Sequence, residues 1–92
     1  MSNFRLFETN EFLKQRKKMG AVQPAFVERK CGEYVYPQIR AEPHFGPNIK
    51  KLVGYKPETW RYRIGKLRLF YLIDEKTRVV SVLTVEFRKD AY

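Results

Sequence analysis

Cysteine and histidine are scarce in this chain of 92 residues, which has only Cys31 and His44. One thiol can neither close an internal disulfide nor supply a cysteine-based metal site. No stretch approaches the 18 apolar residues of a membrane-spanning helix, and the first residues lack the apolar run of a signal peptide. We therefore expect a soluble, cytoplasmic protein that uses no metal ion or cofactor and has no membrane partner.

Acidic residues are also few. There are 10 Asp and Glu against 19 Lys and Arg, which gives a formal net charge of +9. Such a field attracts polyanions and speeds encounter with them. A solvated basic surface that only serves solubility is the alternative, but the clustering of the charge favours nucleic acid or another polyanion as the ligand.

The length and an apolar content of 43% fit one domain, residues 1–92, with a single core. The segment NFRLFE alternates as a short first strand does. Residues 9–20 then predict a helix, which Thr9 or Asn10 caps and which turns Phe12 and Leu13 inward.

A second helix is predicted from Pro24 onward, because proline is favoured at the first helical position. Its apolar stripe consists of Val27, Cys31, Tyr34 and Val35. Pro37 should end or kink this helix at Tyr36. A Pro-Gly loop follows, and it contains His44, for which we expect no catalytic role. Residues 49–55 hold either a brief extended piece or a turn.

From Trp60 the apolar period changes to two, and WRYRI, KLRLFYLID and RVVSVLTVEF read as three strands. Gly65 and Lys66 suit a two-residue hairpin turn with a positive φ at the glycine. The expected fold class is α+β, with the order β-α-α-β-β-β and an antiparallel sheet that carries the two N-terminal helices on one face.

The hairpin turn fixes which side chains share a face. The core face receives Trp60, Tyr62, Ile64, Leu67, Leu69 and Tyr71. The opposite face receives Arg61, Arg63, Arg68 and Phe70, and Arg63 lies directly across from Arg68. Like charges in that position repel each other. Because arginine is a good bidentate phosphate ligand that stays charged at any working pH, we favour a phosphate-binding groove over a merely solvated face.

Which side chains of the last strand face the core depends on the length of the turn before it. A turn of three or five residues puts Val79, Ser81, Leu83 and Val85 in the core. Arg78, Val80, Val82, Thr84, Glu86 and Arg88 then join the arginine face. A turn of even length would instead place Arg78 in the core, which we do not expect. A slip of one residue would invert the faces.

The C-terminal stretch resembles a known family, the RelE/ParE superfamily of type II toxins, and it is most similar to the RelE-like mRNA interferases. The likeness is carried by Tyr62, Arg63, Gly65, Arg68 and Tyr71, and by the closing RKDAY. Upstream, YVYPQIRAEPHFGPNIKKLVGY resembles the Pro-Gly loop and K-L-x-G-Y segment of these toxins.

The resemblance implies a small sheet with two helices on one side and a ribosome-dependent endoribonuclease that cuts mRNA in the ribosomal A site. It implies metal-independent attack by a ribose 2′-oxygen on the adjacent phosphate. The residues implied to be catalytic are Arg61, Arg63, Arg68, Arg88 and Tyr92. Arg63, Arg68 and Arg88 suit stabilisation of the phosphorane. Arg61 either orients a neighbouring phosphate or assists protonation of the leaving group, and Tyr92 either stacks on a base or aligns the ribose.

The general base is the open role. Some relatives have a histidine or lysine where this chain has Phe87, which either stacks on a nucleobase or packs. Glu86 is the one carboxylate near the cluster, so it is a candidate base, although it could instead tether one arginine. The remaining candidate RNA contacts are Lys66 and the basic run Arg16, Lys17 and Lys18, for which a solvated helix face is the alternative.

The implied partners are a cognate antitoxin, mRNA in the ribosomal A site, and ribosomal RNA. Val80, Val82, Phe70 and Leu72 are expected to form an apolar strip that the antitoxin could cover. Two other functions stay open. One is a ParE-like DNA gyrase poison, and the other is a catalytically weak RNA-binding homologue of the toxins.

Overall fold

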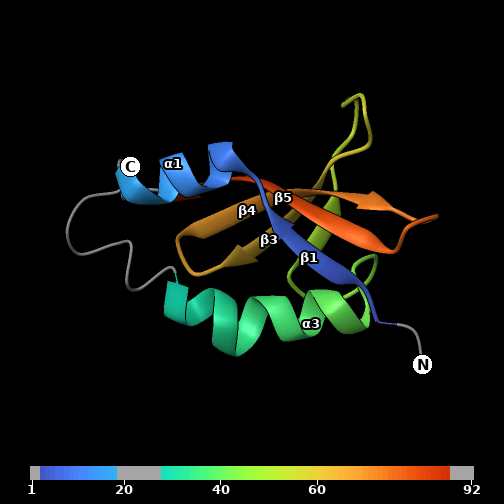
Figure 1. The fold of residues 1–92 in the computed structure, drawn as a ribbon, viewed down its shortest axis with the longest axis horizontal. Coiled ribbons are helices and arrows are strands. Elements are labelled where there is room, and N and C mark those ends of the chain that lie inside the picture. The colour runs from blue at the N-terminus through green and yellow to red at the C-terminus, as the bar shows by residue number, and fades with distance from the viewer. Residues whose placement is uncertain (1–2, 19–27, 88–92) are drawn as a thin grey trace.

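The computed structural model describes residues 3–18 and 28–87, without the side chain of Phe87. Its elements are β1 (Arg5–Glu8), α1 (Asn10–Lys18), the π-helical turn η1 (Cys31–Val35), α3 (Tyr36–Ala41), β2 (Ile49–Lys51), β3 (Trp60–Ile64), β4 (Leu67–Asp74) and β5 (Val79–Phe87). Residues 28–30 are also helical, so that one helical segment runs to the end of α3 (Figure 1). The α+β class is confirmed, and the extended alternative for residues 49–55 is realised as β2.

The sheet has the strand order β1-β5-β4-β3-β2. The pairs β3–β4 and β4–β5 are antiparallel, as expected, and β2 also pairs antiparallel with β3. β1, however, runs parallel to β5, with Arg5 opposite Val79 and Glu8 opposite Val82. The sheet is therefore mixed. No tight turn joins β1 to β5, and strands that are not connected by a hairpin are free to pair in either direction.

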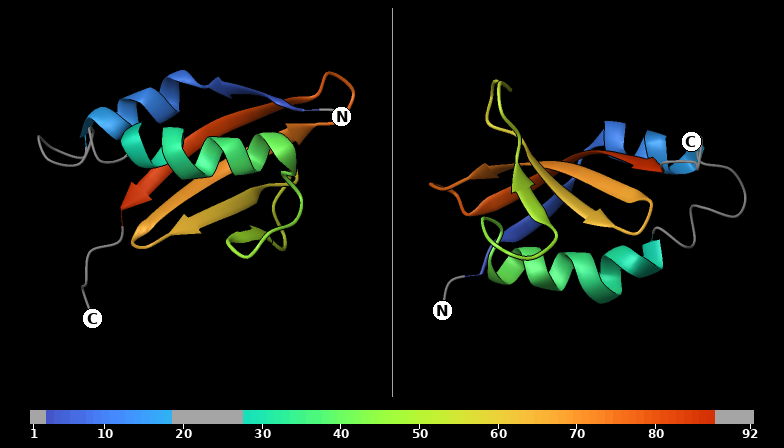
Figure 2. Two further views of the ribbon diagram at one scale, coloured as in Figure 1. Left: turned by 90° about the horizontal axis from the view of Figure 1, so that it is seen from below. Right: turned by 180° about the vertical axis from the view of Figure 1, so that it is seen from behind.

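The core occupies one face of the sheet. Tyr62, Leu69, Tyr71, Val80 and Val82 project from β3, β4 and β5 and are at most 1% exposed. Phe12 of α1 and the helical residues Cys31, Val35 and Ile39 join the same buried cluster. Both helical segments therefore cover the same face, in the relation that Figure 2 shows from two further sides. Fully burying one such aliphatic side chain stabilises the fold by about 1.5–3 kcal/mol.

Thr9 joins the start of α1 to β5. Its hydroxyl accepts a hydrogen bond from the backbone N–H of Phe12 at 3.2 Å, which makes Thr9 the cap of the helix. The same hydroxyl is 2.7 Å from the carbonyl oxygen of Val82 and 3.1 Å from that of Leu83, and it can donate to either. Phe12 points inward as expected, whereas Leu13 is 38% exposed because only one of two adjacent helical positions faces this core.

Pro37 lies inside the second helical segment rather than at its end. The N–H of Tyr36 donates to the carbonyl of Cys31, five residues back, and α3 continues to Ala41. Proline is tolerated in the first turn of a helix, and the wider π-helical turn before it starts α3 afresh. Cys31 and Val35 are buried as predicted, but Tyr34 is 51% exposed. Gly20, Pro24 and Val27 lie outside the described residues.

The register predicted for the first half of β5 is wrong. Asp74 pairs with Val79, so the turn has the even length that we did not expect, and Val80 and Val82 are buried. Arg78 does not enter the core, because it lies in the turn with a φ of 59° and its guanidinium stands 4.3 Å from the ring centre of Phe4.

A β-bulge then corrects the phase of β5. Phe70 pairs with Thr84 and Tyr71 with Val82, which leaves Leu83 as the extra residue. Val85 is therefore buried, as predicted, and Glu86 lies across from Arg68. The expected apolar strip loses Val80 and Val82 to the core.

Candidate functional site

The site begins at the turn between β3 and β4. Gly65 has a φ of 59°, a conformation that favours glycine, and the turn it makes with Lys66 sets Ile64 opposite Leu67. Arg63 consequently lies directly opposite Arg68, as the sequence predicts. Their β-carbons belong to a cross-strand pair, for which about 5 Å is the usual separation.

The face away from the helices carries rows of side chains that follow from the strand register. One row contains Glu86, Arg68 and Arg63, and the next contains Thr84, Phe70, Arg61 and Lys50. A third row contains Phe7, Ser81 and Leu72. This outward face is thus basic over β2, β3 and the start of β4 and apolar toward β1.

The arginines of this face are not neutralised by the part of the chain that the structure describes. No acidic side chain within residues 3–18 and 28–86 forms an ion pair with Arg61, Arg63 or Arg68. In the same residues the Nε atoms of Arg61 and Arg68 are buried without a hydrogen-bond partner. A buried donor without a partner is costly, and more so on a charged group. An anion with several oxygens would supply the missing acceptors.

A pocket of about 290 Å³ opens beside these arginines. It is lined by Pro47, Asn48, Arg61, Arg63 and Gly65. The carbonyl of Asn48 accepts a hydrogen bond from the N–H of Arg63 at 2.9 Å, which holds the loop before β2 against β3. Sequence reasoning missed Pro47 and Asn48 as part of the site. Their position follows from the pairing of β2 with β3, for which the sequence offered only the short segment after the Pro-Gly loop.

A partly buried polar network supports this wall from behind. The hydroxyl of Tyr62 donates to Oε1 of Gln38 at 2.6 Å and lies 3.4 Å from Nδ2 of Asn48. Gly46 packs on Gln38 so closely that a β-carbon at this position would stand 2.4 Å from Nε2. The pocket wall is therefore fixed to α3 as well as to β3.

Glu86, the candidate base, is exposed and lies across from Arg68. The two side chains make no ion pair, so the alternative that Glu86 tethers this arginine has no contact in the structure to support it. Phe87 pairs with Leu67 through its backbone, while its side chain lies outside what the structure describes. Arg88 and Tyr92 also lie outside the described residues.

The remaining candidate RNA contacts lie in two places, the last turn of α1 and the turn between β3 and β4. Arg16, Lys17 and Lys18 form the last turn of α1, which packs on the core face of the sheet. Arg16 is 3.7 Å from Glu8 and 5.6 Å from the ring centre of Phe12, whereas Lys17 and Lys18 are exposed. Lys66 is exposed in the hairpin turn, close in sequence to the arginine pair.

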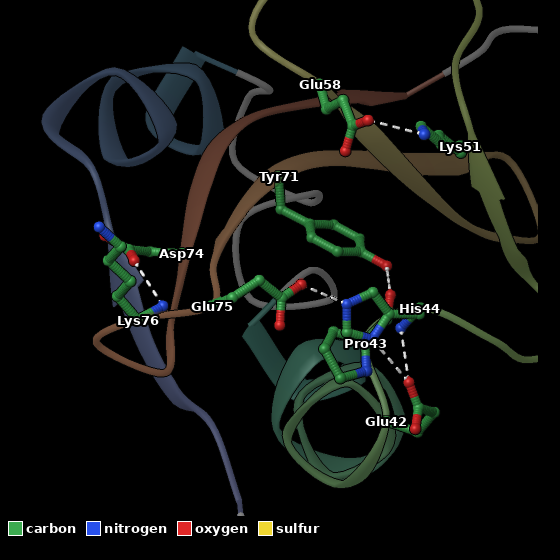
Figure 3. Close-up of polar contacts among 9 residues, drawn as sticks. All are labelled: Glu42, Pro43, His44, Lys51, Glu58, Tyr71, Asp74, Glu75 and Lys76. Atoms are coloured by element: carbon green, nitrogen blue, oxygen red, sulfur yellow. Dashed lines mark hydrogen bonds and ion pairs between the residues drawn. The ribbon is translucent and has the colours of Figure 1, made fainter.

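His44 belongs to a different cluster at the other end of β4. Its Nδ1 is 2.8 Å from Glu42 and its Nε2 is 2.5 Å from Glu75 (Figure 3). The hydrogen bond with Glu75 is the main cause that raises the pKa of His44 above its ordinary value. β4 rises roughly 20 Å between Arg68 and Asp74 at ~3.4 Å per residue. His44 therefore ties a loop to a turn, at the end of β4 away from Arg68.

Two further searches of the described residues bear on the chemistry. Within them no group of three or more His, Cys, Asp or Glu side chains is arranged to hold a metal ion. In the same part of the chain no helix is long and apolar enough to cross a membrane.

No protein-family model and no curated protein matches the sequence. Solved structures do match. The chain is similar to one chain of the toxin–antitoxin complex RelBE2 from Mycobacterium tuberculosis, with 24% identity and a TM-score of 0.78 over 98% of this chain and 97% of the other. It is also similar to a chain of the archaeal RelE–RelB complex from Pyrococcus horikoshii, with 21% identity and a TM-score of 0.63 over 97% and 99%.

A third likeness is to a double mutant of the Escherichia coli toxin RelE in the free state, with 22% identity and a TM-score of 0.65 over 99% of this chain and 88% of that one. The TM-scores of 0.63–0.78 establish the architecture, and identities of 21–24% carry the comparison no further than the fold. The chain has the fold of the RelE toxins, as its sequence resemblance predicts.

Proposed function

We propose that the protein is the toxin of a type II toxin–antitoxin system and acts in the cytoplasm as a ribosome-dependent endoribonuclease that cleaves mRNA and stops translation. The observation that carries the proposal is that three arginines of the outward face form no ion pair with an acidic side chain among the described residues. They are Arg61, Arg63 and Arg68. The RelE fold supports the same function, because the solved structures that share it include the toxin RelE and a toxin–antitoxin complex.

The proposed reaction is an internal transfer at phosphorus. The 2′-oxygen of a ribose loses its proton and bonds to the adjacent phosphorus, and the bond to the 5′-oxygen of the next nucleotide breaks. The products are a cyclic phosphate and a free 5′-hydroxyl, which gains a proton. Arg63 and Arg68 stabilise the negative charge of the phosphorane. Arg61 holds a neighbouring phosphate or assists the leaving group. Because guanidinium groups supply the positive charge, the reaction as proposed needs no metal ion.

Three residues complete the proposed site. Arg88 would add a further cation, Tyr92 would stack on a base or align the ribose, and Glu86 would accept the 2′ proton. A weak base would be sufficient if the ribosome orients the mRNA, since orientation alone can supply much of the rate enhancement.

The proposed partner is a cognate antitoxin, in keeping with two neighbours of this fold that are toxin–antitoxin complexes. The apolar side of the outward face suits its docking. Phe7 is 58% exposed, and Leu72 and Phe70 are half-buried beside the arginines. An antitoxin segment that covers these side chains and places acidic residues on Arg61 and Arg68 would block the site.

The test compares Arg63→Ala and Arg68→Ala with Arg40→Ala, an exposed arginine of α3 that matches them in charge. We expect both site variants to abolish growth arrest and to lower the rate of mRNA cleavage on ribosomes by about 10²–10³-fold, the usual loss for removal of a charge-stabilising group. Arg40→Ala should stay toxic. Primer extension should detect new 5′ ends within translated codons.

Two results would overturn the proposal. If both site variants remain fully toxic, the arginine pair is not the active site. Intact mRNA together with DNA damage would identify a gyrase poison instead.

A further inference from the structure

We propose that the loop between β2 and β3, residues 52–59, is a second RNA-binding subsite. It would take the single strand that continues from the arginine pocket and stack one of its bases on Tyr55. The choice of RNA rests on the proposed function, whereas the subsite itself uses residues that the cleavage reaction does not.

The loop is held at its base and exposed at its tip. The N–H of Leu52 donates to the carbonyl of Thr59 at 2.9 Å, and Thr59 is buried. Gly54 turns the chain with a φ of 83°. Val53 is 92% exposed and Tyr55 is 56% exposed. Figures 1 and 2 show this segment projecting beyond the sheet. An aromatic ring is thus displayed on an anchored arm, where a ligand can reach it.

A concave surface accompanies the ring. A pocket of about 550 Å³ is lined by Lys51, Leu52, Val53, Gly54, Tyr55, Lys56 and Glu58. Lys51 is paired with Glu58 at 2.7 Å, while Lys56 is exposed near the tip (Figure 3 shows the ion pair). The loop therefore combines an open ring with a cation one residue away, which is the pairing that binds a base and its phosphate.

Basic residues connect the loop with the arginine pocket. Arg61 lies directly opposite Lys50, and both belong to the outward face that also carries Arg63. Along β3 the base of the loop at Thr59 begins roughly 7 Å from Arg61, at ~3.4 Å per residue. Lys50 thus adds a cation between the pocket and the loop, whereas Lys51, the next residue of β2, points to the other face and is paired with Glu58.

The composition of this path favours nucleic acid over a protein. Bases of any type stack on an exposed tyrosine, and their phosphates match lysines and arginines arranged in a line. Interfaces with proteins are instead depleted of lysine relative to the rest of the surface. Here Val53 and Tyr55 stand apart from the core and are flanked by Lys51 and Lys56.

The experiment measures binding of a fluorescein-labelled single-stranded RNA of about ten nucleotides to the purified protein by fluorescence anisotropy. Tyr55→Ala should weaken binding about tenfold, and Tyr55→Trp should restore it, because the larger ring also stacks. Lys56→Ala should reduce the slope of log affinity against log salt by about one. Tyr34→Ala is the matched control, because Tyr34 is 51% exposed on the helical side and also lies near a lysine, with Lys30 Nζ 4.9 Å from its ring centre.

The outcomes separate this inference from the proposed function. If the wild type does not bind the RNA, or if Tyr55→Ala binds it as tightly as the wild type, the subsite is refuted, even where Arg63→Ala still abolishes cleavage. If Tyr55→Ala weakens binding and the wild type cleaves no mRNA, the subsite stands and the proposed nuclease fails. If Tyr55→Ala no longer binds an acidic protein partner but binds the RNA as before, the inference is also overturned.

Discussion

Replacing Arg63 by glutamine is expected to stabilise the isolated protein, although it removes a residue of the proposed active site. Arg63 and Arg68 are directly opposite each other. Two unit charges about 5 Å apart repel by about 0.8 kcal/mol in water. The value for water applies because Arg63 is exposed, and the repulsion is smaller where the side chains diverge. We therefore expect a gain of about 0.5 kcal/mol, within the range of cross-strand pairs, and a rise in Tm of about 2–4 °C.

Thermal unfolding followed by circular dichroism at low salt measures this gain. The control is Arg40→Gln, which removes the same charge from an exposed site on α3 and corrects for the net charge of the chain. Added salt should reduce the difference between the two variants, because it screens the arginine pair. If Arg63→Gln melts at or below the Tm of Arg40→Gln at low salt, the pair is not repulsive. The reasoning that it requires an anion would then be wrong.

Two further predictions test other parts of the structure. Glu75 and Glu42 raise the pKa of His44 above 6.5, so this contribution to stability is full below pH 6.5 and is lost as the pH rises through the higher folded-state pKa. His44→Gln should therefore flatten the fall in Tm toward alkaline pH, and an unchanged profile would contradict the role of the cluster. Val80→Thr buries a hydroxyl in the core and should cost about 1–3 kcal/mol in urea unfolding, whereas Val79→Thr, at a half-buried position, should change stability by less than about 0.5 kcal/mol. Equal losses would argue against the register of β5.

The β3–β4 hairpin could be predicted from sequence because its turn permits little choice. A two-residue turn that begins with glycine permits one pairing register. The alternation of apolar Tyr62 and Ile64 with the arginines of β3 then fixes both faces. The arginine pair follows directly. The part of the site that depends on this hairpin was therefore accessible without coordinates.

The start of β5 could not be predicted in the same way. Its turn ends on Arg78, a residue with a β-carbon that nevertheless has a positive φ, and no local pattern announces this. The bulge at Leu83 is held by Thr9, whose hydroxyl lies more than 70 residues away along the chain. A bulge that depends on a residue so distant in the chain leaves no periodic signal in the local sequence. The two departures compensate in phase, which is why Val85 is still buried and Glu86 still shares the face of Arg68.

The pocket wall and the second subsite were missed for a related reason. β2 has only three residues, so its alternation is too short to distinguish from a turn. Once β2 pairs with β3, Asn48 comes beside Arg63 and Lys50 beside Arg61. The parallel direction of β1 likewise depends on packing between the two ends of the chain.

The two borders of the sheet have a consequence for how the protein behaves at high concentration. Of the described strands, β1 has four residues and β2 has three, and these are the outermost strands. The N–H of Phe4, just before β1, is already used by the carbonyl of Arg40. Lys50 and Lys51 place two charges along the other border. Short, charged borders resist edge-to-edge pairing, so we expect the protein to remain dispersed at high concentration rather than to form fibres.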